Sequence, residues 1–213
     1  MTWAIAVGSA AVAALLLFQY REFRPGIIVA KLTAASSFVW ACLLWGGMAS
    51  AYGQIILVGL MLCWLGDALL LPPGQSLWFQ LGIGAFLAGH LAYAIAFLQG
   101  PLSPVGVGVS AIALSVFAFL VLRWLAPHVP PDFKRPVVAY LFVISVMVVL
   151  AIGSSVATGR PAAAVGAVAF ALSDVSVSRD RFVAPGFVNG VWGLPLYFAS
   201  QFVLASTVLT PLE

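Results

Sequence analysis

The chain has 213 residues, of which 63% are hydrophobic and 7% are charged. Soluble globular domains carry about 25% charged residues, so this composition excludes a soluble fold and indicates a helical protein that crosses a membrane repeatedly. The formal net charge of +3 comes from nine Lys and Arg residues against six Asp and Glu residues. Most of these Lys and Arg residues lie at the ends of apolar runs, where they act as topology signals. We therefore expect no nucleic-acid binding.

Eight apolar runs alternate with short connections rich in Pro and Gly, which leave no room for a soluble domain. Each run has about 18 to 23 residues, close to the ~20 that a helix needs to cross a bilayer. We read the first as a spanning helix and not as a cleaved leader, because basic residues follow it and do not precede it. The sequence predicts an all-α bundle in one integral membrane domain, residues 1–213, with transmembrane helices at 2–20, 26–48, 52–71, 77–98, 104–125, 136–157, 161–178 and 189–210.

Basic residues predict the orientation of these helices, because Lys and Arg concentrate in cytoplasmic connections. With eight spans, both termini lie on one side, where the connections hold Arg160. We therefore expect both termini outside a bacterial cytoplasmic (inner) membrane. The opposite, cytoplasmic side receives seven basic residues: Arg21, Arg24, Arg123, Lys134, Arg135, Arg179 and Arg181.

Two segments suggest an internal duplication. "VGLMLCWLGD" at 58–67 and "VGAVAFALSD" at 165–174 share Val, Gly, Leu and Asp at an offset of 107 residues. The shared Asp is informative because the chain has only four aspartates. Four helices per half, residues 1–103 and 104–213, would form parallel repeats about an axis along the membrane normal. Asp67 and Asp174 would then lie at the same depth.

Polar side chains inside the spans mark a candidate site, since one Asp or Lys at a helix centre costs roughly 2.5–3.5 kcal/mol to insert. We count depth at ~1.5 Å per residue from the basic end of each helix. By this count, His90 and Gln201 lie about 18–20 Å in. Four others lie roughly 6–8 Å in: Lys31, Asp67, Tyr140 and Asp174. Polar groups at one level predict a chamber open toward the cytoplasmic leaflet, with the deeper pair as its floor. The residues are Lys31, Asp67, His90, Tyr93, Tyr140, Asp174, Tyr197 and Gln201.

Each of these residues also has a structural interpretation. Lys31 can extend its amine to the interface or form a structural ion pair with one Asp. His90 can be a packed, hydrogen-bonded side chain, and Tyr197 and Gln201 can bond between helices. Small residues at Gly82, Ala85 and Gly89 can pack helices within or between chains. Cys42 and Cys63 both fall in apolar runs, where we expect packed thiols.

The residue set favours general acid–base chemistry by Asp67 and Asp174 without a metal or cofactor. Burial keeps a carboxylic acid protonated, whereas a carboxylate beside a cation stays ionised. Which aspartate is the acid is left open. A zinc site is disfavoured because His90 is the one histidine within a span. A triad of Ser173, His90 and Asp67 is disfavoured because their depths differ by more than two turns.

The segments "GLMLCWLGDALLL", "GIGAFLAGHLAYAIAF", "AYLFVISVMVVLA", "VGAVAFALSDVSVSRDRF" and "LYFASQFVLAS" resemble the YhhN family of membrane proteins, which includes the lysoplasmalogenases. The resemblance runs from Lys31 to about Ser206 and rests on the order of GD, H-x-x-Y, SD and Y-x-x-x-Q. The chain departs from the family at Leu32, where Pro is frequent, at Cys63, where Ser is common, and at Phe198, where Trp is usual.

The resemblance implies hydrolysis of the vinyl ether bond of a lysoplasmalogen or related lysolipid, which yields a fatty aldehyde and a glycerophospho-base. Asp67 and Asp174 would be catalytic. Membrane lipids would surround the chain, and the partner in the site would be a lysophospholipid. Its phosphate would lie near Arg181 and Lys31. The remaining predicted substrate-binding residues are His90, Tyr93, Tyr140, Asn189, Tyr197 and Gln201.

Two other functions fit a membrane bundle with paired aspartates. One is a proton-coupled transporter for a small molecule, in which the aspartates relay protons. The other is a non-catalytic lipid-binding protein. Transport needs access from both faces, and the outward halves of the helices hold few polar residues, which favours a one-sided pocket. Head group, chain length and oligomeric state stay open at this point.

Overall fold

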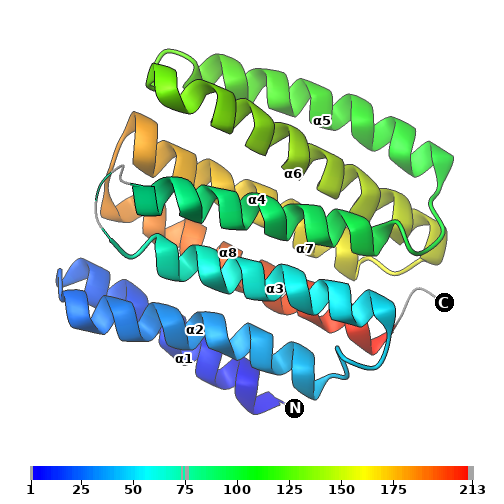
Figure 1. Cartoon of the computed structure of the whole chain (residues 1–213), viewed down its shortest axis with the longest axis horizontal. Coiled ribbons are helices and arrows are strands. Elements are labelled where there is room, and N and C mark those ends of the chain that lie inside the picture. The colour runs from blue at the N-terminus through cyan, green and yellow to red at the C-terminus, as the bar shows by residue number, and fades with distance from the viewer. Residues whose placement is uncertain (1, 73, 75–76, 211–213) are drawn as a thin grey trace.

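The computed structural model describes residues 2–72, 74 and 77–210. Within these residues the fold is all-helical, and the eight predicted transmembrane helices are confirmed (Figure 1). They are α1 (Thr2–Tyr20), α2 (Arg24–Leu44), α3 (Ala51–Leu69), α4 (Leu77–Phe97), α5 (Pro104–Leu125), α6 (Pro131–Thr158), α7 (Ala162–Ser178) and α8 (Phe187–Ser206). A π-helical turn, η1 (Arg179–Val183), continues α7, and a 3₁₀ turn, η2 (Thr207–Leu209), follows α8.

Most helix boundaries lie within two residues of the prediction, whereas the end of α2, the start of α6 and the end of α8 differ by four or five residues. α2 ends at Leu44 and not at 48, because the chain turns at Gly46, whose φ of 91° lies in the left-handed region that glycine tolerates. α6 begins at Pro131 and not at 136, since proline suits the first helical position, where its missing N–H is not needed. α7 ends at Ser178 as predicted, but η1 continues the helical path by a further turn.

The two halves of the chain pack in matching ways. α1 packs on α2 as α5 packs on α6, and α3 packs on α4 as α7 packs on α8. Across the halves, α4 packs on α6 as α8 packs on α2. This pairing supports the duplication of residues 1–103 and 104–213, which we continue to propose.

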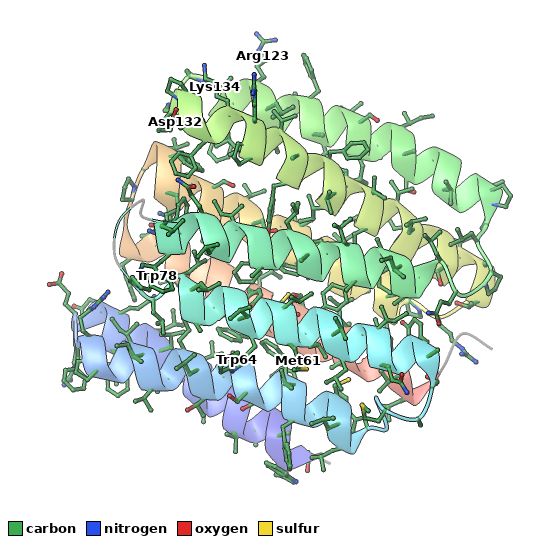
Figure 2. The ribbon with its side chains drawn as sticks, in the orientation of Figure 1. Met61, Trp64, Trp78, Arg123, Asp132 and Lys134 are labelled. Carbon is green, nitrogen blue, oxygen red and sulfur yellow. The ribbon has the colours of Figure 1, made fainter. Side chains whose placement is uncertain are left out.

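Apolar side chains cover the outside of the bundle, as the bilayer requires. α5 shows this most clearly, because Val105, Val109 and Ile112 are each at least 65% exposed. Both termini lie at one end of the bundle (Figure 1). The connections that carry most of the basic residues lie at the other end, where Figure 2 shows Arg123 and Lys134 beside the α5–α6 connection. The chain is therefore an integral membrane protein.

Glycines bring α3 and α4 into close contact, so that polar side chains of both helices meet inside the bundle. A Cβ at Gly59 would lie 2.5 Å from the Tyr93 ring, and a Cβ at Gly89 would lie 2.9 Å from the Cys63 sulfur.

Cys42 and Cys63 are buried free thiols.

We predict that Gly89→Val destabilises the fold, because the larger side chain cannot fit against Cys63 and the Gly59 carbonyl without moving α3. Overpacking of this kind typically costs about 1–3 kcal/mol. Gly84→Val on the same helix is the matched control, since a Cβ there would meet nothing within 4 Å. Thermal unfolding of the two variants in detergent, monitored by size-exclusion chromatography, would compare their melting temperatures. Equal melting temperatures for the two variants would contradict the close α3–α4 packing.

Candidate functional site

A cavity of about 480 Å³ is lined by residues from all eight helices, α1 to α8. It reaches the end of the bundle that carries most of the basic residues, where Glu22, Arg181 and Phe187 form part of its wall. Asp67 and Asp174 both line this cavity, from different halves of the chain. Of the other predicted site residues, Lys31, Tyr140, Arg181, Asn189 and Tyr197 also line it.

Asp67 lies in a compact cluster of hydrogen-bond donors. Lys31 Nζ is 3.2 Å from Asp67 Oδ1, and the side chains of Lys31 and Asp67 are 14% and 3% exposed. Tyr197 donates its hydroxyl to Asp67 Oδ2 at 2.7 Å. Each carboxylate oxygen therefore has a donor, and the lysine compensates the negative charge inside the bilayer. Lys31 is paired with Asp67 and not with Asp174.

Asp174 has a different set of partners. Tyr140 donates its hydroxyl to Asp174 Oδ2 at 2.9 Å. His90 Nε2 lies 3.6 Å from the same oxygen, beyond hydrogen-bond distance. The Asp174 side chain is 18% exposed, against 3% for Asp67, so it is the more accessible carboxyl group from the cavity.

The two carboxyl groups have related surroundings. Asp67 and Asp174 are 107 positions apart, and so are His90 and Tyr197 (174 − 67 and 197 − 90). Tyr197 on α8 contacts Asp67, and His90 on α4 is the neighbour of Asp174. Thus α8, in the second half, supplies a ring to Asp67 in the first half. Its equivalent helix α4, in the first half, supplies a ring to Asp174 in the second half. One ring is a phenol that donates, and the other is an imidazole that can donate or accept.

Tyr93 and Gln201 form a separate polar contact deeper in the bundle. Tyr93 donates its hydroxyl to Gln201 Oε1 at 2.7 Å, and both side chains are fully buried. Phe170 contacts residues of both levels, because its ring stacks on His90 at 4.2 Å between centroids and also packs against Tyr93 and the cavity-lining Tyr197. Neither Tyr93 nor Gln201 lines the cavity.

Asn189 holds the connection between α7 and α8. Its amide donates to Asp180 Oδ1 at 2.9 Å and to the Ala184 carbonyl at 2.8 Å, and it accepts from Arg179. This network positions Arg181 at the cavity, where its guanidinium lies over the Phe79 ring at 4.9 Å from the centroid. Arg181 forms no ion pair within the described part of the chain, so its charge is available to an anion in the cavity.

Counting residues from the predicted helix ends misjudged the depth of several side chains. His90 was expected to lie deeper than Asp174, yet the two are neighbours. The reason is that η1 extends α7 to Val183 and α6 starts at Pro131, so Asp174 and Tyr140 each lie nine residues from their helix ends (183 − 174 and 140 − 131). Ser173 donates its hydroxyl to the Phe170 carbonyl at 2.7 Å, within its own helix.

Several functional neighbours were missed by sequence reasoning. Phe170 and Phe86 shape the surroundings of His90, but two aromatic residues in apolar helices carry no distinguishing signal. Phe117 and Val121 line the cavity from α5. The apolar sequence of α5 predicts only a lipid-facing helix. Glu22 could have been noticed, because it is the one acidic residue in the first connection.

In the described residues, no three His, Cys, Asp or Glu side chains are grouped as a metal site.

Comparisons with known proteins identify relatives of this chain. The human protein named lysoplasmalogenase TMEM86B is 29% identical over 174 residues, which cover 82% of this chain and 70% of that protein. The pig protein of the same name is 30% identical over 153 residues, covering 71% and 62%. A lysoplasmalogenase of Mycobacterium tuberculosis (strain CDC 1551 / Oshkosh) is 36% identical over 128 residues, covering 58% and 48%. No solved structure matches the chain significantly.

The YhhN family model matches residues 23–208, which contain every helix from α2 to α8. This range includes Asp67, Asp174 and all of the other predicted site residues. The resemblance noted in the sequence is thereby confirmed, and the chain belongs to the YhhN family of membrane proteins.

Proposed function

We propose that the chain is a membrane hydrolase that cleaves the vinyl ether bond of a lysoplasmalogen or a related lysolipid. The observation that carries this proposal is the pair of differently compensated carboxyl groups on the wall of one cavity. The names of the human, pig and mycobacterial relatives support the same reaction class.

The cavity matches an amphiphile with one hydrocarbon chain. Its apolar wall comes from α4, α5 and α6 and includes Ile83, Val121 and Ile144, whereas its polar wall includes Glu22 and Arg181 near the basic end. A volume of about 480 Å³ falls within the range of about 300–1,000 Å³ that is typical of ligand pockets. A lysolipid would place its tail on the apolar wall and its phosphate near Arg181, where a guanidinium can bind two phosphate oxygens.

Vinyl ether hydrolysis needs a proton donor and a stabilising negative charge. The acid gives its proton to the β-carbon of the vinyl group, whose π electrons form the new C–H bond and leave an oxocarbenium ion. The ionised carboxylate stabilises this cation. Water then adds to the carbon that bears the ether oxygen, and a proton of this water restores the acid. The hemiacetal releases the aldehyde as its hydroxyl proton passes to the departing glycerol oxygen, so the cycle consumes one water and no cofactor.

A transport path is not favoured by the cavities. The small cavity beside Tyr52 and Ser154, on the side of the termini, has a volume of about 20 Å³. That space holds about one water molecule and no lipid or solute. No residue lines both cavities in the described part of the chain. The orientation expected from the basic residues would open the larger cavity toward the cytoplasmic leaflet.

We predict that Asp67→Asn and Asp174→Asn each reduce aldehyde release by at least about 100-fold, the low end of what general acid–base groups contribute. Asp132→Asn is the matched control, because Asp132 is exposed at the start of α6, outside the cavity. The measurement is aldehyde release from a lysoplasmalogen by purified protein in detergent. Near-normal turnover in either cavity variant would contradict the two-carboxyl mechanism.

A double substitution separates the structural role of the Lys31–Asp67 pair from a catalytic role. Lys31→Met alone should destabilise the fold, because breaking a buried pair typically costs about 3–5 kcal/mol. Adding Asp67→Asn removes the uncompensated charge, so the double variant should regain most of its melting temperature and still release no aldehyde. If the double variant is stable and active, Asp67 is a structural partner of Lys31 only.

The apolar wall should determine the accepted chain length. We predict that Val121→Phe, which fills the wall on α5, lowers the turnover of long-chain lysoplasmalogens about tenfold or more relative to short-chain ones. Val116→Phe is the control, because Val116 is 56% exposed on the same helix and does not line the cavity. Turnover of a series of chain lengths provides the test, and an unchanged profile in Val121→Phe would place the tail elsewhere.

A further inference from the structure

The surroundings of His90 determine which of its ring nitrogens carries hydrogen. His90 Nδ1 lies 2.6 Å from the Phe86 carbonyl oxygen, one turn back on α4. A carbonyl oxygen can only accept a hydrogen bond, so Nδ1 is the protonated nitrogen. In the neutral ring, Nε2 then presents a lone pair, and this lone pair faces Asp174 Oδ2 at 3.6 Å.

This arrangement is unfavourable if Asp174 is a carboxylate. His90 Nε2 is buried and has no hydrogen-bond partner among the residues that the structure describes, and the His90 side chain is 1% exposed. Two lone pairs would then face each other in a bilayer interior, where an unsatisfied polar group costs several kcal/mol. A proton on Asp174 removes the conflict, because a carboxylic acid can present a hydrogen-bond donor to Nε2.

Asp67 has no comparable need for a proton. Lys31 and Tyr197 already supply a donor to each of its oxygens, and the lysine neutralises its charge. Asp174 has one neutral donor, Tyr140, and no lysine or arginine ion pair within the described residues. The two carboxyl groups therefore differ in how their charge is compensated.

We propose that Asp174 and His90 share one proton that resides on Asp174 in the resting protein, and that Asp67 is permanently ionised. Asp174 is then the acid, and Asp67 is the carboxylate that stabilises the cation. His90 is a positioning residue that orients the acidic proton, a role different from the substrate contact predicted from the sequence. The catalytic roles rest on the proposed function, whereas the location of the proton does not.

Infrared spectroscopy of the purified protein at neutral pH would test the location of the proton. A protonated carboxyl group has a C=O band that is separate from carboxylate and amide bands and shifts in D₂O. We expect this band in the wild type and in Asp67→Asn, and its loss in Asp174→Asn. Asp132→Asn again serves as the control. A band that survives Asp174→Asn and disappears in Asp67→Asn would overturn the assignment.

Nuclear magnetic resonance provides a second measurement that needs no change in the cavity. The chain has two histidines, and His128 lies in the α5–α6 connection. In His128→Gln protein labelled with ¹⁵N-histidine, the remaining signals come from His90. We expect a neutral ring protonated at Nδ1, whereas a doubly protonated imidazolium would overturn the proposal. A protonated Asp174 without aldehyde release from any lysoplasmalogen would contradict the proposed function and leave this inference intact.

Discussion

The need to compensate buried charge governs the interior of this protein. A bilayer offers no water to ionised groups, so each carboxyl group inside the bundle must find a cation, enough donors or a proton. Asp67 is compensated by Lys31 and Tyr197, and Asp174 receives a hydrogen bond from Tyr140 with His90 beside it. The same constraint that makes the pair costly in folding also makes the two groups chemically different. In the proposed mechanism, one cavity thus offers both a proton and a negative charge, which is the combination that a vinyl ether needs.

The matching packing of the two halves explains how such a pair can arise. If the chain is a duplication, Asp67 and Asp174 began as equivalent side chains, as did His90 and Tyr197. Exchange of a phenol for an imidazole replaces a hydroxyl with a ring nitrogen whose role as donor or acceptor depends on the tautomer. A lysine on α2 then compensates one aspartate, and its counterpart region on α6 contributes Tyr140 instead. Small differences between equivalent positions are sufficient to give two carboxyl groups opposite roles.

Sequence reasoning predicted the fold well because the bilayer leaves few alternatives: long apolar runs must be helices, and eight were found. It also selected Lys31, Asp67, Tyr140, Asp174 and Tyr197, since polar residues in such runs are rare. It could not predict which partner each aspartate takes, because a sequence position on α2 does not show which aspartate Lys31 faces. It misjudged the depth of Asp174 relative to His90, because the π-helical continuation of α7 has no sequence signal. The contributions of Phe170 and α5 were also hidden, because apolar side chains look alike in an apolar chain.

Protonation of carbon inside a chiral cavity is the central step of this account, and the product can report it directly. The purified protein would hydrolyse a lysoplasmalogen in D₂O, and the aldehyde would be reduced at once to the alcohol to prevent later exchange. An acid held in one position on the cavity wall delivers deuterium to one face of the double bond. The account predicts one deuterium at carbon 2 of the fatty alcohol, in a single configuration. An equal mixture of the two configurations, or bound lysoplasmalogen that yields no aldehyde, would contradict it.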